Sequence, residues 1–213
     1  VPGHKVFHQE GSKFMQPRQR NQAWSIQHLE VFLLAMMLLA TVYMSWLTLQ
    51  QSKDHFRLER TGSFVARFNS TEMVSLREDV DRWLATKEPP EALFKRSQSP
   101  PVTSGQVNDQ AIAKAAAAME QFTKLRTLTN YFQEFGSATK FGILADRYAH
   151  NLLGNVCVRY GEELGPFIEF MRSQRNRPGI YAEVEWLRNR MRELDAVDRV
   201  RSDATKVPLA PVK

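Results

Sequence analysis

An acidic and an imidazole side chain four residues apart are the pair in this sequence best placed to do chemistry. On a helix, Asp146 and His150 would lie on the same face, where the carboxylate can raise the basicity of the ring for general-base catalysis. The same spacing is typical of a surface or capping pair, which is the commoner arrangement in proteins. We therefore interpret the pair as structural and keep a catalytic dyad as the alternative.

The other reactive side chains fit structural roles. Glu162 and Glu163 are adjacent, so their side chains diverge around a helix and cannot work as a pair. The single cysteine, Cys157, cannot form an intramolecular disulfide, and its apolar helical setting predicts a small core residue. His4 and His8 have the spacing of metal ligands on a helix, but the prolines and glycines around them disfavour a helix there. No metal and no other cofactor is expected.

Sequence motifs of the common enzyme classes are absent. The chain has no Walker loop, no dinucleotide-binding glycine motif, no zinc-protease helix, no CxxC pair and no serine-hydrolase elbow. This pattern predicts a protein that is not an enzyme and has no small-molecule substrate. An enzyme acting at a membrane stays open only if Asp146 and His150 lie buried together in a cleft.

Arginines interspersed with acids dominate the C-terminal part of the chain. The whole sequence has 29 Lys and Arg against 23 Asp and Glu, and its net charge of +6 is too moderate to identify an anionic partner. Because no aromatic stacking platform accompanies the arginines, nucleic acid is not expected as a partner. They are interpreted as a salt-bridged surface or as contacts with a partner subunit. The arginines predicted for partner contacts are Arg172, Arg175, Arg177 and Arg188.

Helices must position these residues, and one helix is evident as an apolar run. The stretch VFLLAMMLLATVYMSWLTL, from Val31 to Leu49, holds nineteen residues without a charged side chain. As a helix it would be roughly 28 Å long, close to the ~30 Å hydrocarbon thickness of a bilayer. A core helix of a soluble bundle is rarely apolar on every face, and a cleavable signal peptide has a shorter apolar region. We therefore predict a transmembrane helix over residues 27–50.

Two sets of side chains in and beside this helix are predicted to make contacts. Aromatic rings that prefer the headgroup zone would anchor it at the membrane interfaces, namely Trp24, Tyr43 and Trp46. Small side chains would form a face for close packing against other transmembrane helices, namely Ala35, Ala40 and Ser45. Four Lys or Arg residues flank the helix on each side, so their count does not set its orientation.

Helical periodicity continues through the rest of the chain. Apolar positions three and four apart predict a helix that is capped near Ser70, and a long helix that runs from Asp109 until Gly136 closes it. The next helical region is expected to be interrupted at Gly154 and kinked at Gly165 and Pro166. No stretch alternates in the manner of a strand. The predicted fold class is therefore all-α, with a single transmembrane helix followed by a small helical bundle.

The domain organisation follows from these elements. We expect residues 1–26 to be an extended basic tail, 27–50 the transmembrane helix, 51–70 a juxtamembrane connector, 71–195 a helical domain with a Pro/Ser-rich linker at 95–108, and 196–213 a C-terminal tail.

One segment of the predicted domain, residues 131–191, has a recognisable pattern. A helix ending in an aromatic and acidic pair leads to G-[IL]-L, then to a helix with an aromatic residue before a partly basic segment, and then to a Tyr-containing start of the last helix. The matching residues are Tyr131, Phe132, Glu134, Gly142, Leu144, Tyr160, Pro166, Phe167, Ile168, Arg172, Tyr181 and Trp186. On these residues the segment resembles a bacterial family of membrane-anchored proteins, domain of unknown function four-seven-six-zero. The resemblance implies a membrane helix ahead of a cytoplasmic domain and implies no activity. The long basic tail before the helix departs from that pattern.

Two functional hypotheses follow. The leading one is a non-catalytic accessory or scaffolding subunit of a large membrane complex, photosynthetic or respiratory, whose partners are other membrane-protein subunits and the lipid bilayer. The alternative is a membrane-tethered signalling or stress-response module that binds a soluble partner. Both hypotheses place the protein in a bacterial inner or photosynthetic membrane as a single-pass protein.

Overall fold

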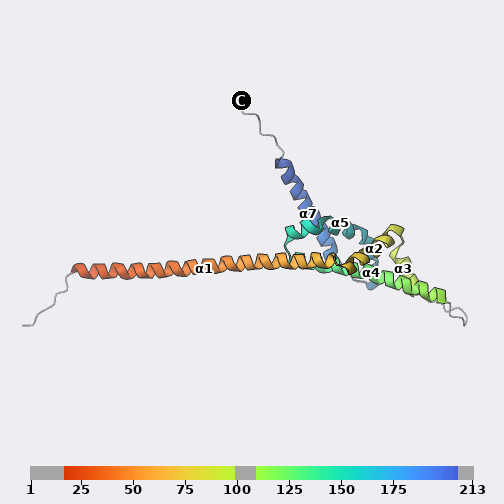
Figure 1. The fold of residues 1–213 in the computed structure, drawn as a ribbon, viewed down its shortest axis with the longest axis horizontal. Coiled ribbons are helices and arrows are strands. Elements are labelled where there is room, and N and C mark those ends of the chain that lie inside the picture. Colours follow the sequence, from red (N-terminus) through yellow and green to blue (C-terminus); the bar gives the residue numbers. More distant parts are fainter. Residues whose placement is uncertain (1–16, 99–108, 206–213) are drawn as a thin grey trace, which may run out of the picture. The chain divides into compact units, whose positions relative to one another are not determined.

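The computed structural model describes residues 17–98 and 109–205 of the chain, with side chains for residues 28–98 and 109–203. Within these residues the chain forms seven α-helices and no strand (Figure 1), which confirms the predicted all-α fold. The helices are α1 (Pro17–Phe68), α2 (Thr71–Thr86), α3 (Pro90–Gln98), α4 (Asp109–Lys140), α5 (Asp146–Glu163), α6 (Gly165–Arg175) and α7 (Ala182–Thr205).

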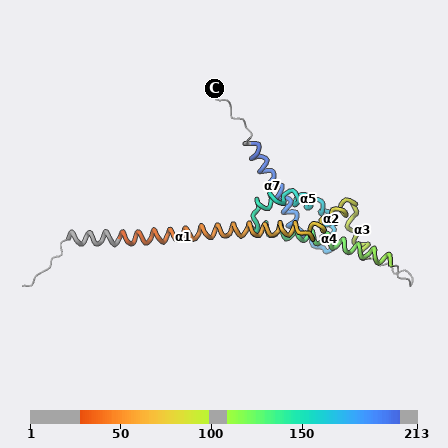
Figure 2. Tube along the Cα trace, viewed as in Figure 1, coloured from red at the N-terminus to blue at the C-terminus, as the bar shows by residue number. Residues whose placement is uncertain are grey.

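Helix α1 is continuous (Figure 2), but it contributes to two compact units that divide between Ser52 and Lys53. In the first unit, the helix from His28 is long and apolar enough to cross a membrane, and 0% of its most apolar stretch is buried. A core helix of a soluble protein would be mostly buried. The apolar run therefore finds no core among the described residues of its own chain.

The first ten residues of α1 lie within the segment predicted as an extended tail over residues 1–26. The helix begins at Pro17, so the prediction is wrong for residues 17–26. Proline is tolerated in a first turn because its missing N–H would have no partner there, and residues 18–26 contain neither Gly nor Pro. Residues 1–16 lie outside the described part of the chain.

The segment predicted as a juxtamembrane connector is helical, because α1 continues to Phe68. The Thr61 hydroxyl donates to the carbonyl of Arg57 at 2.7 Å and accepts the backbone N–H that precedes α5 at 3.0 Å. A hydroxyl satisfied in this way does not compete with the helix ladder.

An aromatic cluster joins the end of α1 to α4 and α5. The rings of Phe68 and Tyr131 lie 5.5 Å apart, and those of Phe132 and Tyr160 lie 5.3 Å apart. The Tyr131 hydroxyl donates to the carbonyl of Phe64 at 2.9 Å, and burial raises its pKa, so it remains a donor. The domain core therefore begins within α1, upstream of the predicted boundary at residue 71.

Helix α4 occupies the centre of the second unit. It packs against α2, α3 and α7, and α7 also packs along α5. Cys157 on α5 is 2% exposed, and burial raises the pKa of its thiol to about 12. This confirms its predicted role as a small core residue.

The predicted start of α2 is confirmed, but the linker after it is shorter than expected. The Ser70 side chain accepts the backbone N–H of Met73 at 3.3 Å and caps α2. The chain turns at Lys87, and Pro90 then starts α3. The linker predicted at 95–108 is therefore wrong over its first four residues, which are helical, and the other ten lie outside the described residues.

Helix α4 does not end at Gly136 as predicted but continues to Lys140. A Cβ atom at Gly136 would overlap the carbonyl oxygen of Glu183 in α7, so the glycine permits close helix packing. At the other end of α4, Ile112 and Met119 are exposed. The predicted apolar face is therefore buried only in the later turns of the helix.

The last three helices differ from the predicted boundaries. Gly154 does not interrupt α5, whereas a break at Leu164 separates α5 from α6, next to the kink predicted at Gly165 and Pro166. Helix α7 continues to Thr205. The predicted tail at 196–213 is therefore wrong over its helical first part, and the residues after it lie outside the described chain.

Candidate functional site

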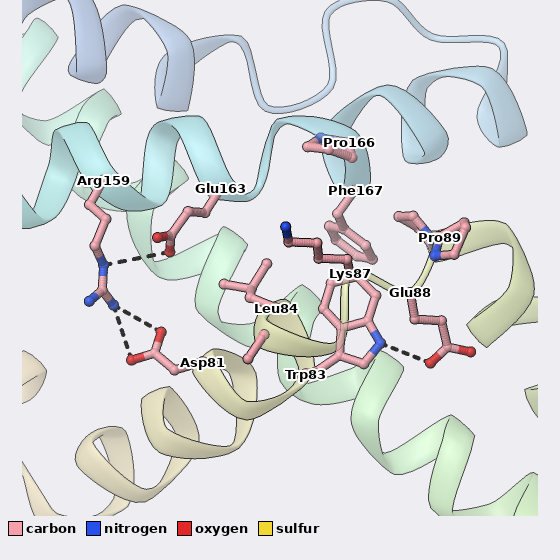
Figure 3. Close-up of a pocket in the computed structure, with 12 residues that line it drawn as sticks. Asp81, Trp83, Leu84, Lys87, Glu88, Pro89, Arg159, Glu163, Pro166 and Phe167 are labelled. Carbon is pink, nitrogen blue, oxygen red and sulfur yellow. Dashed lines mark hydrogen bonds and ion pairs between the residues drawn. The ribbon is translucent and has the colours of Figure 1, made fainter.

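A pocket of about 590 Å³ lies between two helix breaks of the second unit (Figure 3). One break is the turn from α2 to α3, and the other is the junction of α5 and α6. The lining residues are Asp81, Trp83, Leu84, Ala85, Lys87, Glu88, Pro89, Pro90, Arg159, Glu163, Pro166 and Phe167. The volume lies within the ~300–1,000 Å³ that is usual for ligand sites.

The local sequence explains why the helices break here. Lys87 adopts a left-handed conformation (φ 55°), and its N–H bonds to the carbonyl of Leu84 at 3.1 Å, which closes α2. Pro90 is the first residue of α3 and Pro166 the second residue of α6, and in a first turn the missing N–H costs nothing. The two proline-started helices therefore diverge from their predecessors, and the pocket lies between them.

Two aromatic side chains form the apolar wall of the pocket. Phe167 is fully buried, and Figure 3 shows it with Trp83 among the residues that line the pocket. The indole Nε1 donates to Glu88 Oε2 at 3.3 Å, and the same oxygen accepts Arg96 Nη2 at 2.7 Å. The Glu88 carboxylate thus fixes the orientation of the indole, and Arg96 fixes the orientation of the carboxylate. A fixed aromatic wall suits an apolar anchor of a ligand.

Charged groups line the other end of the pocket. Asp81 accepts two hydrogen bonds from Arg159 Nη2, at 2.9 and 3.0 Å, and a third from the Tyr160 hydroxyl at 2.9 Å. Burial and the Asp81 carboxylate both raise the pKa of Tyr160, which keeps the hydroxyl a donor. Arg159 Nε also lies 3.5 Å from Glu163. One guanidinium is therefore shared between two carboxylates.

The pocket has charged groups left for a ligand. Among the described residues no carboxylate pairs with the ammonium of Lys87, and Glu163 is held only by the long contact to Arg159. The lining contains three carboxylates and two cations, and Asp81 and Glu88 are already paired, so a cationic group of a ligand could meet only Glu163 and an anionic group only Lys87. It contains no serine, cysteine or histidine. Its arrangement offers binding by an apolar wall and a charged rim.

The sequence interpretation did not identify this pocket. It marked a kink at Gly165 and Pro166, but it gave Asp81 and Lys87 no role. The available signal was the recurrence of proline at two helix breaks, with Phe167 directly after Pro166. Only the packing of α2 against the α5–α6 junction brings these two signals together.

The predicted pairing of Asp146 with His150 does not occur. His150 Nε2 lies 2.8 Å from Asp195 Oδ1, and its Nδ1 lies 3.7 Å from Asp198 Oδ2. Asp146 accepts Arg190 Nη2 at 2.7 Å. The side chains therefore join α5 to α7 separately, and the dyad alternative is wrong.

The adjacent glutamates diverge as predicted. Glu162 pairs with Arg192 on α7, whereas Glu163 turns toward the pocket. Among the described residues no three His, Cys, Asp or Glu side chains are grouped in a way that could hold a metal ion. His4 and His8 lie outside the described residues.

The four arginines predicted for partner contacts have different environments. Arg172 donates to Glu185 at 2.9 and 3.0 Å and to the carbonyl of Ile180 at 2.9 Å, and its hydrogen bonds lower the pKa of Glu185. Arg172 is therefore held within the domain, and its predicted contact with a partner stays a prediction. Arg188 covers Gly161 with its aliphatic stem.

Arg175 and Arg177 are exposed, and they line a second pocket, described below. Their contacts with a partner stay predictions. The same holds for Arg188, whose guanidinium donates to the neighbouring Asn189 at 3.2 Å.

Two of the aromatic side chains predicted to anchor the apolar helix at the membrane interfaces are described, and both are exposed. Tyr43 and Trp46 stack with their rings 6.2 Å apart. Trp24 lies outside the residues whose side chains are described. Membrane anchoring by these rings stays a prediction.

The predicted small-residue face is only partly formed. Ala40 and Ser45 line a shallow groove that also includes Thr41 and Thr48, but Ala35 does not line it. At 3.6 residues per turn, a spacing of five rotates the side chain by roughly 140°, so Ala35, Ala40 and Ser45 do not follow one line along the helix. The groove follows positions three and four apart instead.

Comparisons with known proteins identify one family. The family model described as Domain of unknown function (DUF4760) matches residues 35–191, which include most of the apolar run and the bundle up to α7. The match therefore extends well upstream of residues 131–191, on which the resemblance was recognised. Neither a search of curated proteins nor a search of solved structures finds a match.

Proposed function

Because the chain belongs to the family Domain of unknown function (DUF4760), whose description names no activity, we propose a function from its own residues: a membrane-anchored module that binds a soluble partner protein. The observation that carries the proposal is the pocket between α2–α3 and α5–α6, with its fixed aromatic wall and charged rim. The occupant would be a peptide segment that combines an apolar anchor with a cationic residue.

The chemistry of the pocket supports this occupant. Trp83 and Phe167 contribute an apolar wall against which an apolar side chain can pack. A lysine or arginine of the partner would meet Glu163, whose carboxylate is only partly neutralised by Arg159. Lys87 lies on the turn that borders the pocket and would meet a carbonyl or carboxylate of the same segment.

The apolar half of α1 supplies the anchor in this proposal. Its length and composition fit a bilayer, and its exposed side chains need an apolar solvent. We place it in a bacterial inner or photosynthetic membrane, with the helical domain in the cytoplasm, as the family resemblance implies. Labelling of a single cysteine introduced at Ser202 in right-side-out and inverted vesicles, with buried Cys157 as internal background, tests this orientation.

A matched pair of variants tests the binding proposal. The full chain in phosphatidylcholine nanodiscs would be used to select binders from a library of twelve-residue peptides. Ala85→Tyr places a ring into the pocket from an exposed position of α2, whereas Ala113→Tyr adds the same ring to an exposed position of α4. The selected peptides should bind Ala85→Tyr at least about tenfold more weakly and Ala113→Tyr unchanged. Equal binding to both variants, or no selected peptide, would contradict the proposal.

A second candidate function is an accessory subunit of a larger membrane complex, photosynthetic or respiratory. The shallow groove along Ala40, Thr41, Ser45 and Thr48 favours it, because the threonine hydroxyls donate to Met37 and Met44 carbonyls at 2.8 and 2.9 Å. Satisfied hydroxyls allow another helix to approach closely. Purification in mild detergent tests this candidate: migration with other subunits supports it, and migration as a free monomer contradicts it.

A further inference from the structure

A second, smaller pocket of about 300 Å³ is lined by arginines from three different elements. Arg126 lies on α4, Arg175 on the last turn of α6, and Arg177 in the turn that follows. The complete lining is Arg126, Asn130, Gln133, Met171, Arg175, Arg177, Gly179, Ile180 and Tyr181. This lining has three positive charges and contains no carboxylate.

The acids of the neighbouring segment are all used elsewhere. Glu183 accepts Gln133 and lies 3.6 Å from Lys140, and Glu185 is bound by Arg172. The acids further along α7 pair with Arg190, His150 and Arg147. In the sequence these acids alternate with arginines and suggest mutual neutralisation. The tertiary structure pairs these acids with other cations and leaves the guanidinium groups of Arg126, Arg175 and Arg177 without a described partner.

The polar side chains of this pocket are arranged by the fold. Arg126, Asn130 and Gln133 are spaced four and three residues apart, which places them on one face of α4. Tyr181 donates to Asn130 Oδ1 at 3.0 Å and holds a left-handed backbone conformation (φ 61°) that non-glycine residues rarely adopt. The Oε1 atom of Gln133 is buried and has no hydrogen-bond partner among the described residues.

Helix-end electrostatics explains only one of the three arginines. A cation in the last turn of α6 is stabilised by the helix dipole, which accounts for Arg175. Arg126 lies in the interior of α4, and Arg177 lies beyond the cap of α6. Three like charges around one concavity repel one another, and a bound anion would remove that repulsion.

We propose that Arg126, Arg175 and Arg177 form a binding site for a phosphate monoester. A guanidinium donates two parallel N–H groups to phosphate oxygens, and three of them match the several acceptor oxygens of a phosphomonoester. The orphaned Gln133 Oε1 would accept a hydroxyl of the same ligand. This chemistry is shared by a soluble phosphate ester of a polyol and by the headgroup of phosphatidic acid.

Two probes carry this phosphate chemistry. The full chain in phosphatidylcholine nanodiscs would be titrated with glycerol phosphate by calorimetry. In parallel, the full chain would be titrated with vesicles of phosphatidylcholine, with and without phosphatidic acid. Saturable binding of glycerol phosphate identifies a soluble phosphate ester as the source, and binding only to vesicles that contain phosphatidic acid identifies a lipid headgroup. Either result supports the proposal, and no saturable binding of either probe would overturn it.

Charge-matched variants separate the site from the general positive charge of the chain. Arg126→Gln and Arg177→Gln remove charges from the pocket, and Arg199→Gln removes one from an exposed position of α7 outside it. Each pocket variant should weaken binding roughly tenfold or more, and Arg199→Gln should change it less than about twofold. All three side chains are exposed, so folding should be retained, as circular dichroism would verify. Equal affinities for the pocket variants and Arg199→Gln would overturn the proposal.

Discussion

The two halves of helix α1 differ in whether their side chains are buried by the rest of the chain. Residues 28–52 are strongly apolar, yet Phe32 keeps 61% of its surface exposed. Residues 53–68 are rich in charged side chains, yet Phe68 is only 1% exposed, in the aromatic cluster with α4 and α5. A single helix thus leaves its apolar half uncovered and buries selected side chains of its polar half.

This difference shows that apolar composition alone does not produce burial within a chain. The polar half is amphipathic, so one face can join a helical bundle while the other meets water. The apolar half has no amphipathic face and no partner helix among the described residues. Its side chains therefore need another apolar surrounding, which in the proposed function is lipid.

The largest expected effect comes from removing the same ring in each half. Phe68→Ala should lower the free energy of unfolding of the bundle by about 3–5 kcal/mol, because it leaves a cavity in the core. Phe32→Ala should change it by less than about 0.5 kcal/mol, because that ring has no described packing partner in the domain. Urea unfolding in mild detergent, followed by circular dichroism, measures both. Equal decreases in the free energy of unfolding for Phe68→Ala and Phe32→Ala would contradict the difference in burial between the two halves of α1.

A charge placed in each half tests the lipid surrounding. Leu38→Lys should cost membrane insertion about 2.5–3.5 kcal/mol, because the charge would lie within the apolar run. Leu58→Lys places the same charge at a position of the second unit that is 46% exposed, so insertion should be unchanged. The fraction of protein that stays with membranes after carbonate extraction measures the effect. Retention of both variants at the wild-type level would contradict a membrane location for residues 28–52.

The smallest effect concerns glycine in the polar half of α1. Gly62→Ala should raise the free energy of unfolding by about 0.5–1 kcal/mol, because alanine favours a helix and the added methyl meets nothing within 4 Å. Gly136→Ala is the contrasting variant, and it should lower stability by about 1–3 kcal/mol because its methyl would overlap Glu183. Thermal unfolding of both variants provides the measurement. A lower free energy of unfolding for Gly62→Ala would contradict the open space found around this glycine.

Helix boundaries were the part of the fold least predictable from the sequence. Gly136 and Gly154 were interpreted as helix ends because glycine is frequent there, but both lie inside helices. Gly136 is explained by the close approach of α7, a contact between residues that are distant in sequence. The cap at Ser70 was predictable because its hydrogen bond to Met73 joins neighbours.

The candidate sites were less predictable than the helices. Local spacing suggested that Asp146 and His150 face each other, but each finds a closer partner on α7. Arg126 had no distinguishing pattern in the sequence. It becomes notable only because the fold brings it to Arg175 and Arg177 and directs the nearby acids elsewhere.

The sequence by itself determined that this protein is helical and that one helix carries an apolar run of membrane-spanning length. Helical periodicity and chain-length arguments depend on neighbouring residues, so they can be made without coordinates. Tertiary structure alone decided which half of α1 joins the domain core, which charges neutralise one another, and where pockets form. Those outcomes depend on contacts between residues far apart in the chain, and no local pattern encodes which of the competing partners is nearest.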